Sequence, residues 1–168
     1  ELALGPFNLT GVLNTCGPDR IVRYRPARMN GTDLFSAWIH HLVLCALSGG
    51  RDVLTCCVAR DGTAEFRAAE SCREILAVIL KYYWEGTTHP LPFFPQTSFT
   101  YADSGKKGGD SERLKRASAV WEGNRNRRGE REELSYRICF QGRDPLDKEF
   151  EKVSLDLFAP LLAHRRQG

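Results

Sequence analysis

Hydrophobic positions recur every three or four residues in three parts of the chain, which predicts three amphipathic helices. These parts are residues 32–47, residues 70–85 and the stretch that begins at Asp147. We expect each apolar stripe to pack into the core, because such a stripe is a core surface far more often than a cofactor site. Pro160 should kink or end the third helix, since its ring clashes with the preceding turn.

Runs of β-forming residues predict strands before and between these helices. The predicted strands are residues 7–15, 20–25, 52–60, 63–67 and 134–141. The turn formers Gly17, Pro18 and Asp19 separate the first two runs, which predicts a β-hairpin. Residues 89–95 hold three prolines and are expected to form an extended connector. Residues 97–101 are expected to form a short strand or a further piece of connector.

Length and composition are those of one globular domain. The chain has 168 residues, of which 42% are hydrophobic and 27% are charged, as in ordinary globular folds. It contains no run of about 18 apolar residues, so no membrane-spanning helix is predicted. The N-terminus has no signal-peptide pattern and is interpreted as the start of a fragment excised from a longer chain.

Positive charge is concentrated in residues 103–133, a segment rich in Gly, Lys and Arg that we interpret as an insertion. Residues 106–131 carry a net charge of +5, whereas the whole chain carries +3. Basic side chains gain affinity for phosphates by releasing counterions, and an aromatic ring can stack on bases. The predicted nucleic-acid-binding residues are Lys106, Lys107, Arg113, Lys115, Arg116, Trp121, Arg125, Arg127, Arg128 and Arg131. A solvated, mobile segment without a partner is the alternative.

The six cysteines are not spaced like a disulfide framework or a metal site. They are Cys16, Cys45, Cys56, Cys57, Cys72 and Cys139, and no Cys-x-x-Cys occurs. Cys56 and Cys57 are adjacent in a predicted strand, so their side chains should point to opposite faces. We therefore expect buried, reduced thiols in a cytosolic protein, and no iron–sulfur cluster.

The predicted order of strand, turn, strand and helix near the N-terminus resembles the metal-binding unit of a large nuclease superfamily. In that unit an acid late in the first strand and an acid-x-Lys triplet ending the second hold Mg²⁺ and position water. Here Asn14 stands at the first acid, Arg23 at the second acid and Arg25 at the Lys. A guanidinium repels Mg²⁺ and stays charged. We therefore predict no metal ion, no cofactor and no catalytic residue.

Several blocks, in order along most of the chain, resemble the C-terminal domain family of RecC, the gamma subunit of bacterial exodeoxyribonuclease V. The blocks are residues 23–26 (RYRP), 38–47 (WIHHLVLCAL), 82–86 (YYWEG), 90–98 (PLPFFPQTS), 101–102 (YA), 121–123 (WEG) and 142–147 (GRDPLD). In this register His41 stands where active relatives carry a helix Gln.

The resemblance implies an α/β, restriction-endonuclease-like fold in which a mixed β-sheet is flanked by helices. It also implies a non-catalytic module of a cytoplasmic bacterial helicase–nuclease, a heterotrimer with RecB and RecD subunits and no membrane contact. Such a module engages a DNA duplex end and the separated strands in double-strand break repair and recombination.

Two other functions stay open at the level of sequence. An active Mg²⁺-dependent DNA exonuclease would use carboxylates such as Asp52, Glu65 and Glu70, although none of them forms an acid-x-Lys triplet. A scaffold that contacts only partner subunits would use the proline-rich connector, the last helix and the pair Leu161 and Leu162.

Overall fold

The computed structural model describes residues 1–49, 51–106 and 109–167. The chain divides into two compact units, one formed by Glu1–Lys81 with the part from Pro160 on, and one formed by Tyr82–Ala159. Within the described residues no helix is both long and apolar enough to cross a bilayer. The assignment of residues 1–168 to a single domain, with an insertion at 103–133, stays a prediction.

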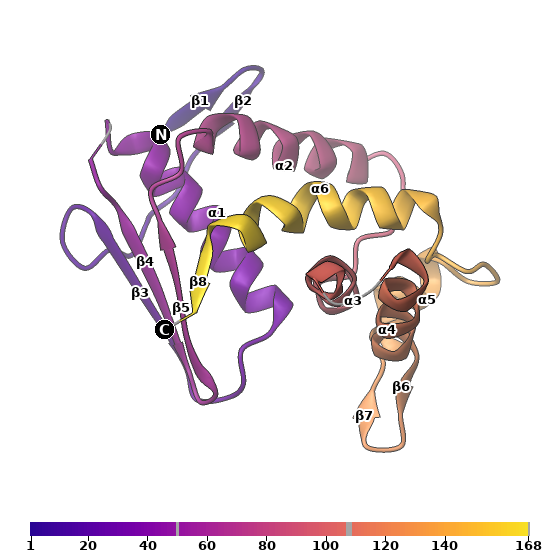
Figure 1. Ribbon diagram of the computed structural model, residues 1–168. Helices are drawn as coiled ribbons and strands as arrows, with labels where there is room; N and C mark the ends of the chain where they lie inside the picture. The colour runs from indigo at the N-terminus through magenta and orange to yellow at the C-terminus, as the bar shows by residue number, and fades with distance from the viewer. Residues whose placement is uncertain (50, 107–108, 168) are drawn as a thin grey trace. The chain divides into compact units, whose positions relative to one another are not determined.

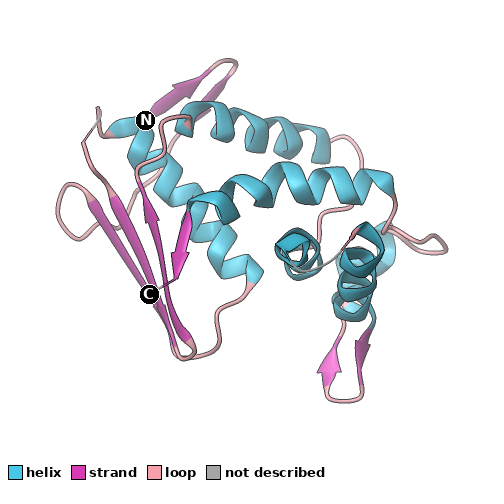
Figure 2. Cartoon of the chain, in the orientation of Figure 1, coloured by secondary structure: helices cyan, strands magenta, loops and turns pink. Residues whose placement is uncertain are grey.

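A four-stranded mixed sheet organises the first unit (Figure 1, Figure 2). The strands lie in the order β3 (Arg20–Arg25), β4 (Leu54–Ala59), β5 (Gly62–Arg67) and β8 (Arg165–Gln167). Helix α1 (Gly31–Leu47) joins the parallel strands β3 and β4, whereas β4, β5 and β8 pair antiparallel. Helix α2 (Cys72–Gly86) follows β5. The predicted α/β class, with a mixed sheet flanked by helices, is confirmed.

The hairpin predicted from residues 7–15 and 20–25 is wrong. Strand β2 (Phe7–Leu9) pairs with β1 (Leu2–Leu4) in a separate two-stranded sheet, and residues 10–19 form no strand. Strand β3 pairs with β4 instead. Parallel partners are joined by a long crossover, so local turn residues carry no information about this pairing.

Trp38 is the largest fully buried side chain on α1. Its ring centroid lies 5.2 Å from that of Phe66 on β5, which places both rings in the core between helix and sheet. The helix begins after Asn30, whose side-chain oxygen accepts the backbone N–H of Asp33 at 2.9 Å. This N-cap satisfies one of the orphan donors of the first turn.

Helices form most of the second unit. They are α3 (Pro95–Asp103), α4 (Asp110–Glu122), α5 (Leu134–Cys139) and most of α6 (Lys148–His164), with the short helices η1 (Ser104–Lys106) and η2 (Glu130–Glu132) and the paired strands β6 (Gly123–Asn124) and β7 (Arg127–Arg128). A buried cluster forms the core of this unit. It contains Phe94, Tyr101, Ala117, Trp121, Leu146 and Phe150.

Residues 97–101, predicted as strand or connector, lie in α3. Pro95 occupies the start of this helix, a position that suits proline because the first helical N–H groups have no partner within the helix. The preceding residues do form an irregular connector, which ends at the fully buried Phe94.

Residues 134–141, predicted as a strand, form α5 and its C-terminal end. Tyr136 and Phe140 are four residues apart, and their ring centroids lie 4.9 and 5.3 Å from that of Phe94 in edge-on contacts. Strand alternation would also have placed Ile138 on that side, but its side chain is 67% exposed. Residues four apart share a face in either conformation, so the exposure of Ile138 between the two rings is what distinguishes the helix from the predicted strand.

Helix α6 begins as predicted and ends later than expected. The Oδ1 atom of Asp147 accepts two backbone N–H groups of the first turn, at 2.9 and 3.0 Å. The helix continues through Pro160 to His164, so Pro160 does not end it. Leu161 and Leu162 are buried, which removes them from the contact surface of the scaffold hypothesis.

All six cysteines are free thiols, but they are not all buried. Cys45, Cys57 and Cys72 are buried and Cys56 is half-buried. Cys16 and Cys139 are exposed, so the expectation of burial is wrong for these two. Burial raises the pKa of the Cys57 thiol to about 11.

Candidate nucleic-acid interface

A short hairpin of strands β6 and β7 follows the C-terminal end of α4 (Figure 1). At its tip, the Oδ1 atom of Asn124 accepts the backbone N–H groups of Asn126 and Arg127 at 2.9 and 3.0 Å. This side-chain-to-backbone turn fixes the course of the tip. Arg125 and Arg127 are both exposed there.

Two glycines close the base of the hairpin. A Cβ atom on Gly123 would lie 2.3 Å from the backbone nitrogen of Gly129, and one on Gly129 would lie 2.3 Å from the carbonyl oxygen of Trp121. Gly123 also has a φ of +72°, a conformation that favours glycine. The backbones therefore cross at a distance that only glycine permits.

Packed residues hold both ends of this hairpin. Trp121, on the last turn of α4, is buried with its ring centroid 4.3 Å from that of Phe94. After the hairpin, the carboxylate of Glu130 accepts the backbone N–H groups of Gln96 and Thr97 at 3.0 and 2.7 Å. These are first-turn donors of α3, so Glu130 caps that helix from a distant part of the chain. Sequence reasoning missed this role, because no local pattern signals it.

Trp121 does not offer the base-stacking surface that was predicted for it. Its side chain is only 7% exposed, and its ring also lies 6.2 Å from that of Tyr136. Contacts with two aromatic rings, those of Phe94 and Tyr136, make Trp121 a core residue, although it is also one of the residues that line the cleft described below.

Ion pairs within the segment engage four of the predicted basic residues. The pairs are Arg113 with Asp110 at 3.8 Å, Arg116 with Glu112 at 2.9 Å, Arg128 with Glu132 at 3.2 Å, and Arg131 with Glu122. Of the predicted basic residues whose side chains the structure describes, Lys115, Arg125 and Arg127 form no ion pair. Lys107 and the side chain of Lys106 lie outside the described part. The full +5 charge is therefore not freely presented.

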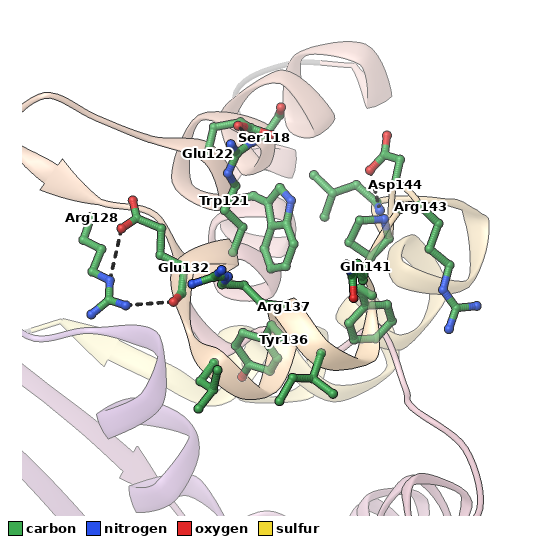
Figure 3. A pocket seen from close by; sticks show the side chains of 17 residues that line it. Ser118, Trp121, Glu122, Arg128, Glu132, Tyr136, Arg137, Gln141, Arg143 and Asp144 are labelled. Atoms are coloured by element: carbon green, nitrogen blue, oxygen red, sulfur yellow. Dashed lines mark hydrogen bonds and ion pairs between the residues drawn. The ribbon is translucent and has the colours of Figure 1, made fainter.

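A cleft of about 830 Å³ lies beside the hairpin, lined by residues of α4, η2, α5 and the following loop (Figure 3). Arg128 and Arg131 line it with their carboxylate partners, and Arg137 and Arg143 line it as well. Figure 3 shows the two bonds from Arg128 to Glu132 at one end of this cleft. The cleft thus places four guanidinium groups beside aromatic walls.

Arg137 and Arg143 were not among the predicted residues. The reason is the misassigned strand at 134–141, which separated these side chains from the basic segment. No local signal separates the two conformations, because Tyr136 and Phe140, four residues apart, share a face in a strand as well as in a helix.

In the first unit, the positions predicted to be a degenerate nuclease site do not assemble as expected. Asn14 is exposed in a segment without strand structure. Arg23 donates from Nη1 to Ser36 Oγ at 2.9 Å, and Arg25 forms an ion pair with Asp33. These bonds attach β3 to α1. They leave no set of oxygen ligands for Mg²⁺, because the carboxylate present is bound by a guanidinium.

His41 is a core residue and not part of a surface site. It is fully buried, stacks on Trp38 with a centroid distance of 5.5 Å, and contacts Thr55 Oγ1 and the carbonyl of Arg67. Across the described residues, no three His, Cys, Asp or Glu side chains are grouped closely enough to hold a metal ion.

Comparison with known proteins relates the chain to one family. The profile described as RecC C-terminal domain matches residues 1–106. The chain belongs to this family. RecC of Escherichia coli K12, named as a subunit of the RecBCD enzyme, is 29% identical over 157 residues, which cover 86% of this chain and 14% of that protein. RecC of Mycolicibacterium smegmatis is 29% identical over 114 residues, covering 64% of this chain and 10% of that protein.

The resemblance to the RecC family found in the sequence is therefore confirmed. The family match spans β1 through η1 and ends before α4, the hairpin and the cleft. The chain spans a small part of the full length of the RecC relatives, at 14% and 10%.

Proposed function

We propose that this chain is a non-catalytic module of the RecC subunit of a RecBCD helicase–nuclease, working in DNA repair and recombination in the bacterial cytoplasm. In this proposal the module engages DNA at a duplex end or at the separated strands, and it also contacts the RecB and RecD subunits. The observation that carries the proposal is the hairpin, which presents Arg125 and Arg127 exposed and without ion pairs.

Two properties of the hairpin favour phosphate binding: arginines without ion pairs and a rigid backbone. An arginine that is already paired with a carboxylate must break that pair to bind a phosphate, whereas Arg125 and Arg127 have no such competitor. The glycine crossing at the base and the Asn124 turn hold the two side chains on a defined support, and this lowers the entropy cost of binding. Arg137 and Arg143 line the adjacent cleft, where the four arginines exceed the three carboxylates, those of Glu122, Glu132 and Asp144, by one charge.

The non-catalytic character is supported by Arg23 and Arg25. They stand where the nuclease pattern requires an acid and a lysine, and they bind Ser36 and Asp33. Fixed positive charge at this place opposes the binding of Mg²⁺.

Replacing both Arg125 and Arg127 with Gln should weaken binding to a blunt DNA duplex end and reduce its salt dependence. Removing one arginine that binds a phosphate should lower the slope of log affinity against log salt concentration by about 1. Fluorescence anisotropy of labelled duplex, measured across a salt series with the 168-residue chain, reads out both quantities.

Lys152→Gln is the matched control, because it removes one exposed charge from α6, away from the hairpin. It should leave the slope nearly unchanged. An R125Q/R127Q variant with the parent affinity and salt slope would exclude the hairpin from the DNA interface. If that variant instead lost binding to RecB or RecD in a pull-down, the hairpin would be a protein contact.

A further inference from the structure

A second pocket lies in the first unit, at the carboxyl ends of the parallel strands β3 and β4. Its volume is about 290 Å³. The pocket is bounded by the ends of both strands and by the first turns of α1. It is lined by Arg23–Arg25, Met29, Asp33, Ser36 and residues 57–59. In open α/β sheets, ligands bind outside the carboxyl ends of parallel strands.

Two guanidinium groups line this pocket from the same face of β3. Arg23 and Arg25 alternate with Tyr24, so both side chains lie on the helix side, where they reach Ser36 and Asp33 of α1. Both arginines are half-buried, and Tyr24 on the other face is 85% exposed. Arg23 has a hydroxyl as its partner and no carboxylate, so its positive charge is not neutralised locally.

The charges facing the pocket favour an anion. Two arginines oppose one carboxylate, that of Asp33, and the other lining residues, among them Met29, Ser36 and Cys57, carry no formal charge at neutral pH. Asp33 leaves the Nε atom of Arg25 without a hydrogen-bond partner in the described structure. The carboxylate therefore occupies only part of the donor capacity of this guanidinium.

We propose that this pocket binds a phosphate group through Arg23 and Arg25, with the Asp33 carboxylate as an internal competitor for Arg25. Planar guanidinium groups match the oxygens of a phosphate, and such charge-assisted hydrogen bonds are the strong ones. The ligand class is a phosphate oxyanion, carried either by a nucleic-acid backbone or by a free phosphate or nucleotide.

The variants Arg23→Gln, Arg25→Gln and Asp33→Asn test this site in the 168-residue chain by titration with inorganic phosphate, followed by isothermal calorimetry or NMR. Loss of either guanidinium should weaken phosphate binding about tenfold or more. Asp33→Asn removes the competing charge and should strengthen binding several-fold, on the order of threefold.

Arg25→Gln should weaken phosphate binding and Asp33→Asn should strengthen it. These opposite effects distinguish a binding site from a purely structural role. Arg25→Gln and Asp33→Asn remove the same ion pair, so a structural effect would shift phosphate binding in the same direction in both. Arg20→Gln is the matched control, because Arg20 lies on the same strand and does not line the pocket. The proposal is overturned if R23Q and R25Q bind phosphate like R20Q, or if D33N binds as weakly as R25Q.

A parallel titration with a short single-stranded oligothymidylate identifies the source of the phosphate. Weaker oligonucleotide binding by R23Q assigns the site to a nucleic-acid backbone, and an effect on inorganic phosphate alone assigns it to a free phosphate. The inference does not depend on the hairpin, since the R125Q/R127Q variant should keep the parent affinity for inorganic phosphate. Failure of the proposed phosphate pocket is thus distinguishable from failure of the proposed DNA-binding hairpin.

Discussion

His41 contacts the carbonyl oxygen of Arg67 through Nε2 at 2.9 Å and Thr55 Oγ1 through Nδ1 at 3.0 Å. A carbonyl only accepts, so Nε2 carries the proton and Nδ1 accepts from the hydroxyl of Thr55. The neutral imidazole is therefore fully hydrogen-bonded in the core. Burial lowers its pKa to about 4, the bond to Arg67 partly offsets this, and the nearby His164 lowers it further.

This pKa predicts a loss of stability in mild acid. The unfolded-state pKa is 6.5 and the folded-state value is about 4, so the contribution of His41 is fully present above pH 6.5. As the pH falls from 6.5 toward 4 the unfolded chain takes up a proton that the folded chain does not, and the free energy of unfolding should fall by up to about 3 kcal/mol.

Urea denaturation at a series of pH values measures this loss, and His41→Gln should flatten the slope in that window. His89 is exposed, so His89→Gln serves as the control and should keep the parent slope. Parallel pH profiles for the parent chain and H41Q would contradict the buried neutral assignment.

Elements with long apolar stripes could be predicted from sequence, and short or non-local ones could not. The stripes of α1 and α6 are buried, and periodicity alone located these helices and α2. In α2 the stripe is buried at Leu76 and Leu80, but its last residues, Tyr83 and Trp84, are exposed, so the expectation of burial is wrong for these two. Helices α3 and α5 are short, and their aromatic residues have β propensity as well. Tertiary contacts decide their conformation: Tyr101 of α3 packs on Phe150, and Tyr136 and Phe140 of α5 pack on Phe94. The pairing of β3 depends on β4, which lies beyond a whole helix. Three residues of the candidate site could not be predicted for the same reason. Glu130, Arg137 and Arg143 gain their roles only from tertiary contacts.

Glu130 gives a test of such a contact at the scale of elements. Glu130→Ala removes the carboxylate that accepts two first-turn N–H groups of α3, so it should reduce the free energy of unfolding by about 1–2 kcal/mol. Glu130→Gln keeps an acceptor oxygen without the charge and should cost less.

Chemical denaturation followed by tryptophan fluorescence measures these changes. Glu133→Ala is the comparison, because Glu133 is exposed and makes no side-chain hydrogen bond to α3. Equal destabilisation by E130A and E133A would contradict the capping role.

At the scale of the whole molecule, positive charge is concentrated in one segment of the second unit, and acidic residues elsewhere balance it, with 13 basic and 13 acidic residues over 82–159. The segment at residues 106–131 carries +5 in a chain whose total is +3. The hairpin of strands β6 and β7 lies within this segment. Composition alone indicated this asymmetry. It did not indicate that four of the arginines are paired with carboxylates, because pairing depends on which side chains meet after folding.

The thiols allow the fold of both units to be tested in one experiment. Brief alkylation of the folded chain with iodoacetamide, followed by peptide mapping, should label Cys16 and Cys139 first, because both are exposed. Cys45 and Cys57 should stay unlabelled until denaturant is added, since burial restricts access and raises the pKa of both thiols, lowering the thiolate fraction. Cys139 is the decisive position: rapid labelling agrees with an exposed face of α5, whereas protection equal to that of Cys57 would favour a buried strand at residues 134–141 and would remove Arg137 from the proposed cleft.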